Sequence, residues 1–300
     1  MVMKEFKNSN QMKSFMKKES ERLNISISNV YHTFVARKIL EKISKANNNL
    51  ILVKGSSAET IYLGSLVRGI TDVDLAGLPG IDVNNDFLIN ILLNNTDEQI
   101  KFSLKKKPII TNTGIHKYST EASFDVMRQD LNIDFQENYD RLIEKQTRVM
   151  PKIFEGDEEF EINVPSFEEY LAEKLCIIVE SNKEDVLNTR VKDFYDIYQL
   201  HGGKYDYDKL THYFGKMLKL RNKINLEDAS TVHLNQKFIK EHKPVWESAK
   251  EKYDFLDHEI DLEGAVYYTR GVLREQLQKQ GLKLPKNTNI KYQKIKRLSM

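Results

Sequence analysis

Hydrophobic and polar positions follow two different periods along the chain. Over the first fifty residues, apolar side chains return every three to four positions, as in SISNVYHTFVARKILEKISKA. This period predicts helices, and Ser28 is the expected N-cap of the second one. LILVKG then predicts a buried strand, AETIYLGSLV a helix and TDVDLAG a second strand. Strand, turn, helix and strand in this order indicate an α/β domain with a mixed sheet.

The later part of the chain predicts one hairpin and then mainly helices. DVNNDFLINILLNN has the pattern of a helix, and ASFDVMRQDLNIDFQ alternates polar and apolar residues on both sides of Gln129 and Asp130. That alternation predicts a hairpin with these two residues as its turn. GDEEFEINVPS predicts extended chain, and helical periodicity follows it to the end of the sequence.

Composition indicates how large a hydrophobic core the chain can form, and the predicted elements suggest how the chain is divided into domains. The 300 residues are 40% hydrophobic and 30% charged, which is enough for one large core or two smaller ones. We expect residues 1–155 to form the α/β domain, with its leading helices, and residues 156–300 a mainly helical domain. The boundary is expected between Pro151 and Pro165.

Cysteine usage and hydropathy narrow the protein class. The single cysteine, Cys176, excludes an intramolecular disulfide and argues against a cysteine-based zinc site, as in a reducing cytoplasm. No run approaches the roughly 20 apolar residues needed to cross a bilayer. We therefore expect a cytoplasmic protein with no membrane partner.

Net charge leaves a nucleic-acid partner open without requiring one. The net charge is +2, and the stretch from Gln276 to Met300 has several lysines but no acidic residue. Such a stretch could contact phosphates, although a solvated basic end is the more frequent outcome.

The stretch KGSSAETIYLGSLVRGITDVDL carries candidate chemistry. In a strand, Asp72 and Asp74 point to the same face, with α-carbons roughly 7 Å apart. Two such anions repel unless a cation lies between them, and Mg²⁺ favours one or two carboxylates together with water and phosphate oxygens. The turn from Gly55 to Ser57 adds N–H groups and hydroxyls at a helix N-terminus, where a triphosphate is favoured. Taken singly, either feature is more often a solvated strand end or a helix cap.

This stretch resembles the nucleotide-binding signature of the DNA polymerase β-like nucleotidyltransferases, specifically the AbiEii/AbiGii toxin family of type IV toxin-antitoxin and phage abortive-infection systems. The positions in register with that signature are Gly55, Ser56, Arg68, Asp72 and Asp74. Ile70 stands where the family has a threonine and Thr71 follows one position later, so the role of Thr71 stays open.

A second stretch, VPSFEEYLAEKLCIIVESNKEDVLNTRVKDFYDIYQL, resembles the downstream helical motif of the same family. The resemblance implies that Lys174 contacts the nucleotide phosphates and that Asp193 is a second functional acid. Asp196 lies three residues further on and is expected to be structural. Without the motif, Lys174 would be interpreted as a helix-surface lysine paired with a glutamate.

The third carboxylate is the least determined part of the expected site. The family takes one from a following strand, and LNIDF offers Asp134. With the hairpin turn at Gln129 and Asp130, however, Asp125 would lie opposite Asp134, where like charges are destabilising. We expect Asp134 to be the third acid, and Asp125 stays the alternative.

The resemblance implies a toxin that uses Mg²⁺ to transfer a nucleotide from an NTP to an acceptor, with tRNA as the expected acceptor, pyrophosphate as the second product and growth arrest as the result. A separately encoded antitoxin is expected, without a stable protein complex. The expected site comprises catalytic Asp72, Asp74, Lys174 and Asp193, nucleotide-binding Gly55, Ser56, Ser57, Arg68 and Lys174, and metal-binding Asp72, Asp74 and Asp134. Two other hypotheses remain: a small-molecule nucleotidyltransferase of the antibiotic-modifying kind, and a toxin that binds NTP without catalysis.

Overall fold

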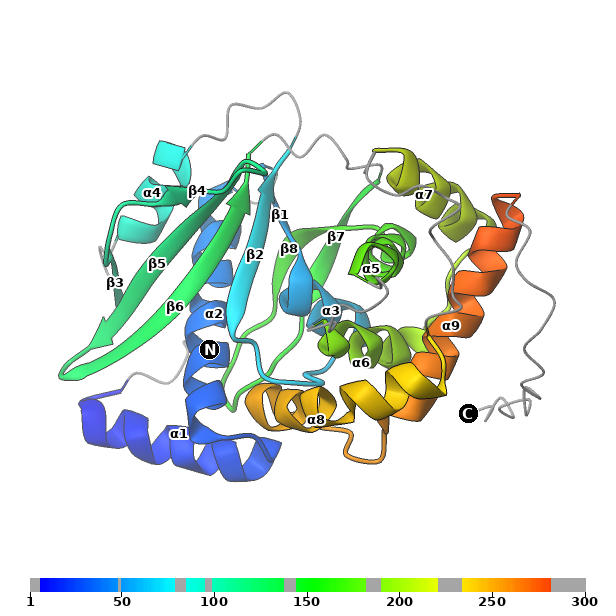
Figure 1. Ribbon diagram of the computed structural model, residues 1–300. Coiled ribbons are helices and arrows are strands. Elements are labelled where there is room, and N and C mark those ends of the chain that lie inside the picture. Colours follow the sequence, from blue (N-terminus) through cyan, green and yellow to red (C-terminus); the bar gives the residue numbers. More distant parts are fainter. Residues whose placement is uncertain are drawn as a thin grey trace.

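A mixed β-sheet forms the centre of the protein in the computed structural model, which describes residues 6–47, 50–78, 85–94, 99–137, 144–181, 190–220 and 234–281 (Figure 1). The strands run in the order β3-β5-β6-β2-β1-β8-β7, and β4 pairs with β5. Two neighbouring pairs, β2 with β6 and β1 with β8, are parallel, whereas the other pairs are antiparallel. The strands are β1 Ile51–Val53, β2 Asp72–Gly77, β3 Lys101–Leu104, β4 Ile109–Ile110, β5 Ile115–Phe124, β6 Met127–Gln136, β7 Lys145–Met150 and β8 Phe160–Pro165.

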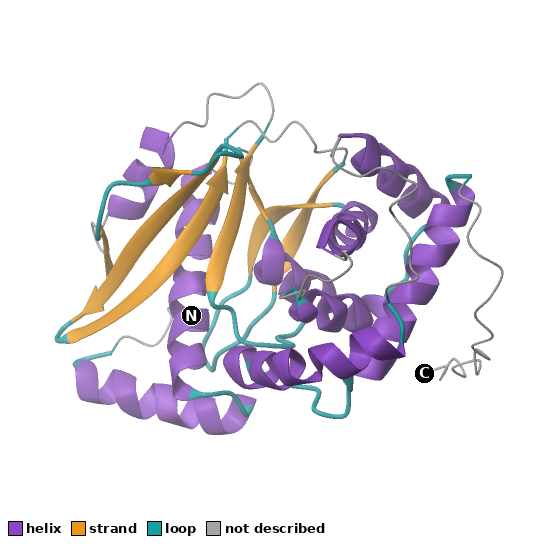
Figure 2. Ribbon diagram, in the orientation of Figure 1, coloured by secondary structure: helices purple, strands orange, loops and turns teal. Residues whose placement is uncertain are grey.

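Helices cover both faces of this sheet (Figure 2). Helix α2 crosses one face, behind the strands in Figure 1, and α3, α5 and α6 lie on the other side. The remaining C-terminal helices pack around α5 and α6. The helices are α1 Ser9–Leu23, α2 Ile27–Asn47, α3 Gly55–Leu63, α4 Asn85–Leu93, α5 Phe167–Ser181, α6 Val191–Gln199, the 3₁₀ helix η1 Leu200–Gly202, α7 Tyr207–Leu220, α8 Gln236–Tyr253 and α9 Leu262–Lys279. The predicted fold class, an α/β part with a mixed sheet followed by a mainly helical part, is confirmed.

Strand β2 shows why the sequence pattern places acids on one face. Successive side chains of a strand point to opposite faces. Val73 and Leu75 are therefore buried in the core against the α2 side, while Asp72 and Asp74 remain partly exposed on the other face. The same alternation that supplies the core thus presents two carboxylates toward α3, α5 and α6.

The predicted hairpin is present, but its predicted turn is wrong. The turn consists of Asp125 and Val126, between β5 and β6, and the residues predicted for it, Gln129 and Asp130, lie inside strand β6. Asp125 has a φ of 50°, a left-handed conformation that aspartate tolerates better than most residues. Because the turn lies four residues earlier than predicted, Asp125 is at the hairpin tip and does not face Asp134.

Two helix ends also differ from the sequence-based expectation. Helix α2 begins at Ile27, so the cap is Ser26, whose Oγ accepts a hydrogen bond from the Asn29 N–H at 3.3 Å, and not Ser28. Helix α3 is shorter than predicted because Gly64 ends it with a φ of 68°.

The expected domain division stays a prediction. The last strand of the sheet, β8, ends at Pro165, and α5 begins at Phe167. Most of the basic C-terminal stretch, residues 282–300, lies outside the described residues. No helix among the described residues is long and apolar enough to span a membrane.

Candidate functional site

A cavity of about 720 Å³ opens between the polar face of β2 and β6 and the helices α5 and α6. The first turn of α3 forms one of its walls. Of the site residues predicted from the sequence, those that line the cavity are Gly55, Ser56, Arg68, Asp72, Asp74, Asp134, Lys174 and Asp193. The structure therefore brings together two motifs that are far apart in the chain, with 100 positions between Asp74 and Lys174.

Three carboxylates share the sheet side of this cavity. Strands β2 and β6 are parallel, and their register places Asp74 directly beside Asp134, with Asp72 two positions along β2. Burial, and next the negative charge of Asp72, raise the pKa of Asp74; Asp134 adds to the rise, Lys192 and Lys54 oppose it, and the resulting pKa is about 6. The anionic form of Asp74 is thus destabilised here, and a bound cation would relieve the repulsion.

The first turn of α3 approaches one of these acids very closely. Gly55 has a φ of 58°, and a Cβ atom at this position would lie 1.8 Å from Oδ2 of Asp74. Only glycine combines this conformation with this approach. The hydroxyls of Ser56 and Ser57 are buried and have no hydrogen-bond partner among the described residues, and no side chain caps the helix. A helix N-terminus of this kind favours an anionic ligand.

The carboxylates fit a divalent cation in the chemistry of their donors. Asp72, Asp74 and Asp134 supply hard oxygen ligands, although Oδ2 of Asp134 also accepts a hydrogen bond from Nζ of Lys117 at 3.0 Å. In the part of the chain that the structure describes, no three acidic, histidine or cysteine side chains are grouped closely enough to hold a metal ion. Mg²⁺ takes one or two carboxylates and completes its shell with water and phosphate oxygens.

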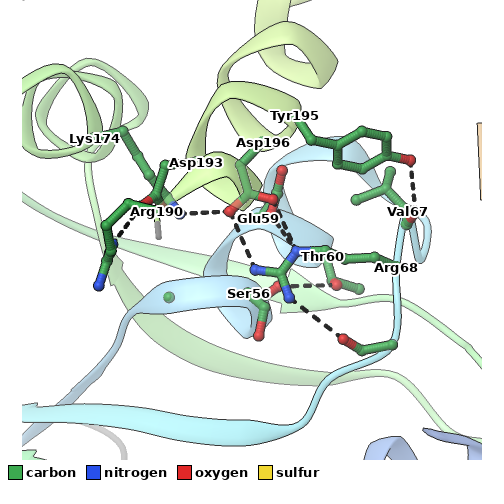
Figure 3. A network of polar contacts seen from close by, with 12 residues as sticks. Ser56, Glu59, Thr60, Val67, Arg68, Lys174, Arg190, Asp193, Tyr195 and Asp196 are labelled. Atoms are coloured by element: carbon green, nitrogen blue, oxygen red, sulfur yellow. Dashed lines mark hydrogen bonds and ion pairs between the residues drawn. The ribbon is translucent and has the colours of Figure 1, made fainter. Parts of the chain in front are cut away.

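A buried ionic network forms the opposite wall (Figure 3). Arg68 donates from Nε to Oδ1 of Asp196 at 2.8 Å and from Nη2 to Oδ2 at 3.1 Å. Nζ of Lys174 donates to Oδ1 of Asp193 at 2.8 Å and to Oδ2 of Asp196 at 2.6 Å. Arg190 donates from Nε to Oδ2 of Asp193 at 2.6 Å. Lys174 is therefore held between two carboxylates from α6.

The network fixes the charge state of its members. Burial alone would raise the pKa of Asp196, but the charges of Arg68 and Lys174 and hydrogen bonds from both hold it below its usual range. Burial likewise opposes the positive charge of Lys174, yet Asp193 and Asp196 raise its pKa well above the ordinary value. Lys174 is thus a permanent positive charge at the edge of the cavity.

The surroundings of some predicted site residues differ from what the sequence motifs implied. Arg68, expected to bind nucleotide, is only 2% exposed; it donates two hydrogen bonds to Asp196 and one, from Nη1, to the carbonyl of Gly69 at 3.4 Å. Asp196 joins Arg68 to Lys174, in keeping with a structural role. Neither Ser57 nor Thr71 is among the described residues that line the cavity. The roles assigned to these residues stay predictions.

Sequence reasoning missed several polar residues of the cavity. Arg190 and Lys192 line it from the start of α6, and their position immediately before Asp193 in TRVKD could have indicated this. Tyr170 also lines it, and its hydroxyl donates to the carbonyl of Gly55 at 2.9 Å. No sequence pattern marks this last contact, because it joins α5 to α3 across the fold.

A comparison with models of known protein families finds a match. The sequence model of the family described as "Nucleotidyl transferase AbiEii toxin, Type IV TA system" matches residues 71–267, a range that includes Asp72, Asp74, Lys174 and Asp193. No curated protein sequence matches the chain.

Solved structures give more distant matches. JHP933 from Helicobacter pylori is 18% identical, with 86% of this chain and 96% of that chain covered and a TM-score of 0.45. A candidate nucleotidyltransferase from H. pylori is 15% identical over 86% and 98% of the two chains, with a TM-score of 0.47. An antigenic nucleotidyltransferase-like protein from Paracoccidioides brasiliensis is 15% identical over 67% and 91%, with a TM-score of 0.35.

Proposed function

The chain belongs to the AbiEii family of nucleotidyl transferase toxins of type IV toxin-antitoxin systems, and we propose that its cavity catalyses Mg²⁺-dependent transfer of a nucleotide from an NTP to tRNA. The family makes an NTP the substrate and an antitoxin the regulator. The metal, the residue roles and the tRNA acceptor are the proposed part. The observation that carries the proposal is the placement of Asp72, Asp74 and Asp134 beside the first turn of α3 in one cavity.

In this proposal the sheet side of the cavity binds the metal. Asp72, Asp74 and Asp134 would hold Mg²⁺, which when bound supplies Lewis-acid stabilisation of the transferring phosphoryl group. The raised pKa of Asp74, about 6, supports this role because the ionised form gains most from a nearby cation.

The helix side of the cavity binds the triphosphate. The N–H groups of the first turn of α3, with the unpartnered hydroxyl of Ser56, which lines the cavity, would donate to phosphate oxygens. Lys174 stabilises the negative charge that develops on the leaving pyrophosphate. The acceptor oxygen forms its bond to the α-phosphorus, the bond from that phosphorus to the β-phosphate oxygen breaks, and a carboxylate of the cavity takes the acceptor proton.

An RNA acceptor is supported by the basic residues around the cavity. Lys117, Arg190 and Lys192 line it in addition to Lys174, and positive side chains at the mouth of an active site favour a polyanionic acceptor. The choice of tRNA follows from the family resemblance. Nucleotide addition to tRNA would arrest growth, and a separately encoded antitoxin would oppose it without forming a stable complex.

The test is incubation of the purified protein with total cellular RNA, Mg²⁺ and each α-³²P-labelled NTP in turn. We expect label in a discrete tRNA-sized band with one nucleotide, and no label with Asp74→Ala or Lys174→Ala. Asp130→Asn is the matched control, because Asp130 lies on the same strand as Asp134 but is exposed and paired with Lys105. It should label RNA like the wild type.

Other outcomes would contradict parts of the proposal. Label in a small molecule but not in RNA would favour the antibiotic-modifying type of transferase. NTP binding without any covalent product, under all acceptor conditions, would favour a non-catalytic toxin.

A further inference from the structure

Glu59, on the second turn of α3, is buried inside the ionic network and accepts no hydrogen bond from the described residues. Its side chain is fully buried, and neither carboxyl oxygen has a hydrogen-bond partner among the described residues. Nε of Arg68 is 3.9 Å from Oε2, but this same nitrogen donates to Asp196 at 2.8 Å. An ionised carboxylate in such a place costs several kcal/mol.

The neighbours of Glu59 decide which carboxyl group carries a proton. Figure 3 shows the carboxyl group of Glu59 beside that of Asp196 and the guanidinium of Arg68. Asp196 accepts hydrogen bonds from both Arg68 and Lys174, which favours its anion. Glu59 accepts none, so of these two adjacent acids Glu59 is the one whose neutral form is favoured.

We propose that Glu59 is protonated in the folded protein and acts as a positioning residue, donating its proton in a hydrogen bond to Asp196 so that Asp196 holds Lys174 at the edge of the cavity. This role rests on the proposed placement of the triphosphate beside Lys174. It assigns a function to a residue that lies within the first stretch but is not one of its signature positions.

The charges around Glu59 support this assignment. Burial, and next the charge of Asp196, raise the pKa of Glu59 well above its usual range, against the opposing charges of Arg68 and Lys174. The phenol groups of Tyr170 and Tyr195, from α5 and α6, are the other titratable neighbours. With Glu59 neutral, Arg68, Lys174 and Arg190 exceed Asp193 and Asp196 by one positive charge. The network can then attract a triphosphate.

Infrared difference spectroscopy tests the protonation directly. The spectrum of wild type minus Glu59→Gln should contain the carbonyl band of a protonated carboxylic acid at neutral pH. Glu19 is the matched control: it is equally buried, but Oε2 accepts hydrogen bonds from Nε and Nη2 of Arg22 at 2.8 and 2.5 Å. Wild type minus Glu19→Gln should therefore show carboxylate bands. Carboxylate bands in the Glu59 difference spectrum would overturn the proposal.

Kinetics test the positioning role. Glu59→Gln keeps the shape and a donor to Asp196, so kcat should stay close to wild type. Glu59→Leu is also neutral but cannot donate, and we expect it to lower kcat about tenfold with little change in the KM for NTP. Equal kcat values for the two folded variants would refute the donor role. A Glu59→Gln protein that does not fold would also contradict the proposal, because an amide reproduces the shape and donor of a protonated acid.

These outcomes are separable from a failure of the proposed function. The infrared spectra require no substrate, and a protonated Glu59 would be seen even if tRNA were not the acceptor. Transfer to any acceptor suffices for the kinetic comparison.

Discussion

Substitution of Gly55 by alanine should displace the Asp74 carboxylate and so lower the rate of nucleotidyl transfer while the protein stays folded. The added Cβ would lie 1.8 Å from Oδ2 of Asp74, whereas ordinary contact begins at 3.4 Å. Because this Cβ belongs to the backbone of α3, the Asp74 carboxylate must retreat by about 1.6 Å. Asp74 is proposed to hold the metal, so the displacement acts directly on the site.

The expected size of the effect follows from two separate terms. A φ of 58° costs an alanine about 1–2 kcal/mol relative to glycine, which lowers the free energy of unfolding. A misplacement of about 1 Å in a catalytic site can lower the rate about 100-fold. We therefore expect Gly55→Ala to remain folded but to lose about two orders of magnitude in nucleotidyl transfer.

Gly64→Ala is the control, because Gly64 ends the same helix with a φ of 68°, and apart from its chain neighbours no atom of the described residues lies within 4 Å of the added Cβ. It should lose a similar free energy of unfolding in a urea titration while keeping its transfer rate in the labelled-NTP assay. Equal activity of the two variants would refute the reasoning that Asp74 must keep its position against α3.

Two further predictions concern charges around the cavity. The pKa of Asp74 is about 6 in the folded protein, against an ordinary value of 3.8 in the unfolded chain. Between these two pH values the metal-free folded protein keeps a proton on Asp74, whereas the unfolded chain has released it. The free energy of unfolding should therefore fall as pH rises from about 4 to 6. The fall amounts to at most about 3 kcal/mol, and Asp74→Asn should abolish it in urea titrations across that pH range. If the variant kept the wild-type pH profile, the prediction would be contradicted. Asp196→Asn weakens the buried pairing of Arg68 and Lys174 and should destabilise the fold by about 3–5 kcal/mol in the same assay, whereas Asp130→Asn, at an exposed pair, should cost less than about 1 kcal/mol. If Asp196→Asn and Asp130→Asn lowered the free energy of unfolding equally, the buried ionic network would not stabilise the fold.

The sequence predicts the elements that carry the acids because they follow strong local patterns. Alternation around Val73 and the helix start at Gly55 and Ser56 depend only on neighbouring residues; the strand is found as predicted, and the helix α3 begins with the Gly-Ser-Ser residues themselves. The hairpin turn is different, because the alternation continues unbroken through Asp125 and Val126 and no Asn-Gly or similar pair marks the turn. Its position is set by how β5 and β6 pair with their neighbours.

The ionic network around Lys174 cannot be predicted from local sequence patterns. Arg68 and Asp196 are 128 positions apart, and nothing in either stretch indicates that they bond. The family motif identifies Lys174 and Asp193, but the importance of Asp196 and the isolation of Glu59 emerge only when α3, α5 and α6 are packed together. Burial decides the charge states, and a sequence does not show which polar side chains will be buried next to one another.

The loop between α3 and β2 shows how the C-terminal helices help to position the acids of the sheet. The carbonyl of Val67 accepts hydrogen bonds from the hydroxyl of Tyr195 and the N–H of Leu256, each at 2.9 Å. The N–H of Gly69 donates to the carbonyl of Tyr253 at 2.8 Å. The residues on both sides of Arg68 are thus held by α6, by the end of α8 and by the chain that follows it.

This loop leads directly into β2, and its position therefore affects Asp72 and Asp74 as well as Arg68. Arg68 fixes Asp196, and Asp196 holds Lys174, so the lysine and the acids are positioned from a common segment. Loosening the loop would move the two sides of the cavity, proposed to bind phosphate and metal, relative to each other, although neither side would lose a side chain. Under the proposed function, the close packing of α6 and the residues after α8 on this loop would therefore affect catalysis, because the C-terminal helices would set the distance across which a nucleotide must fit.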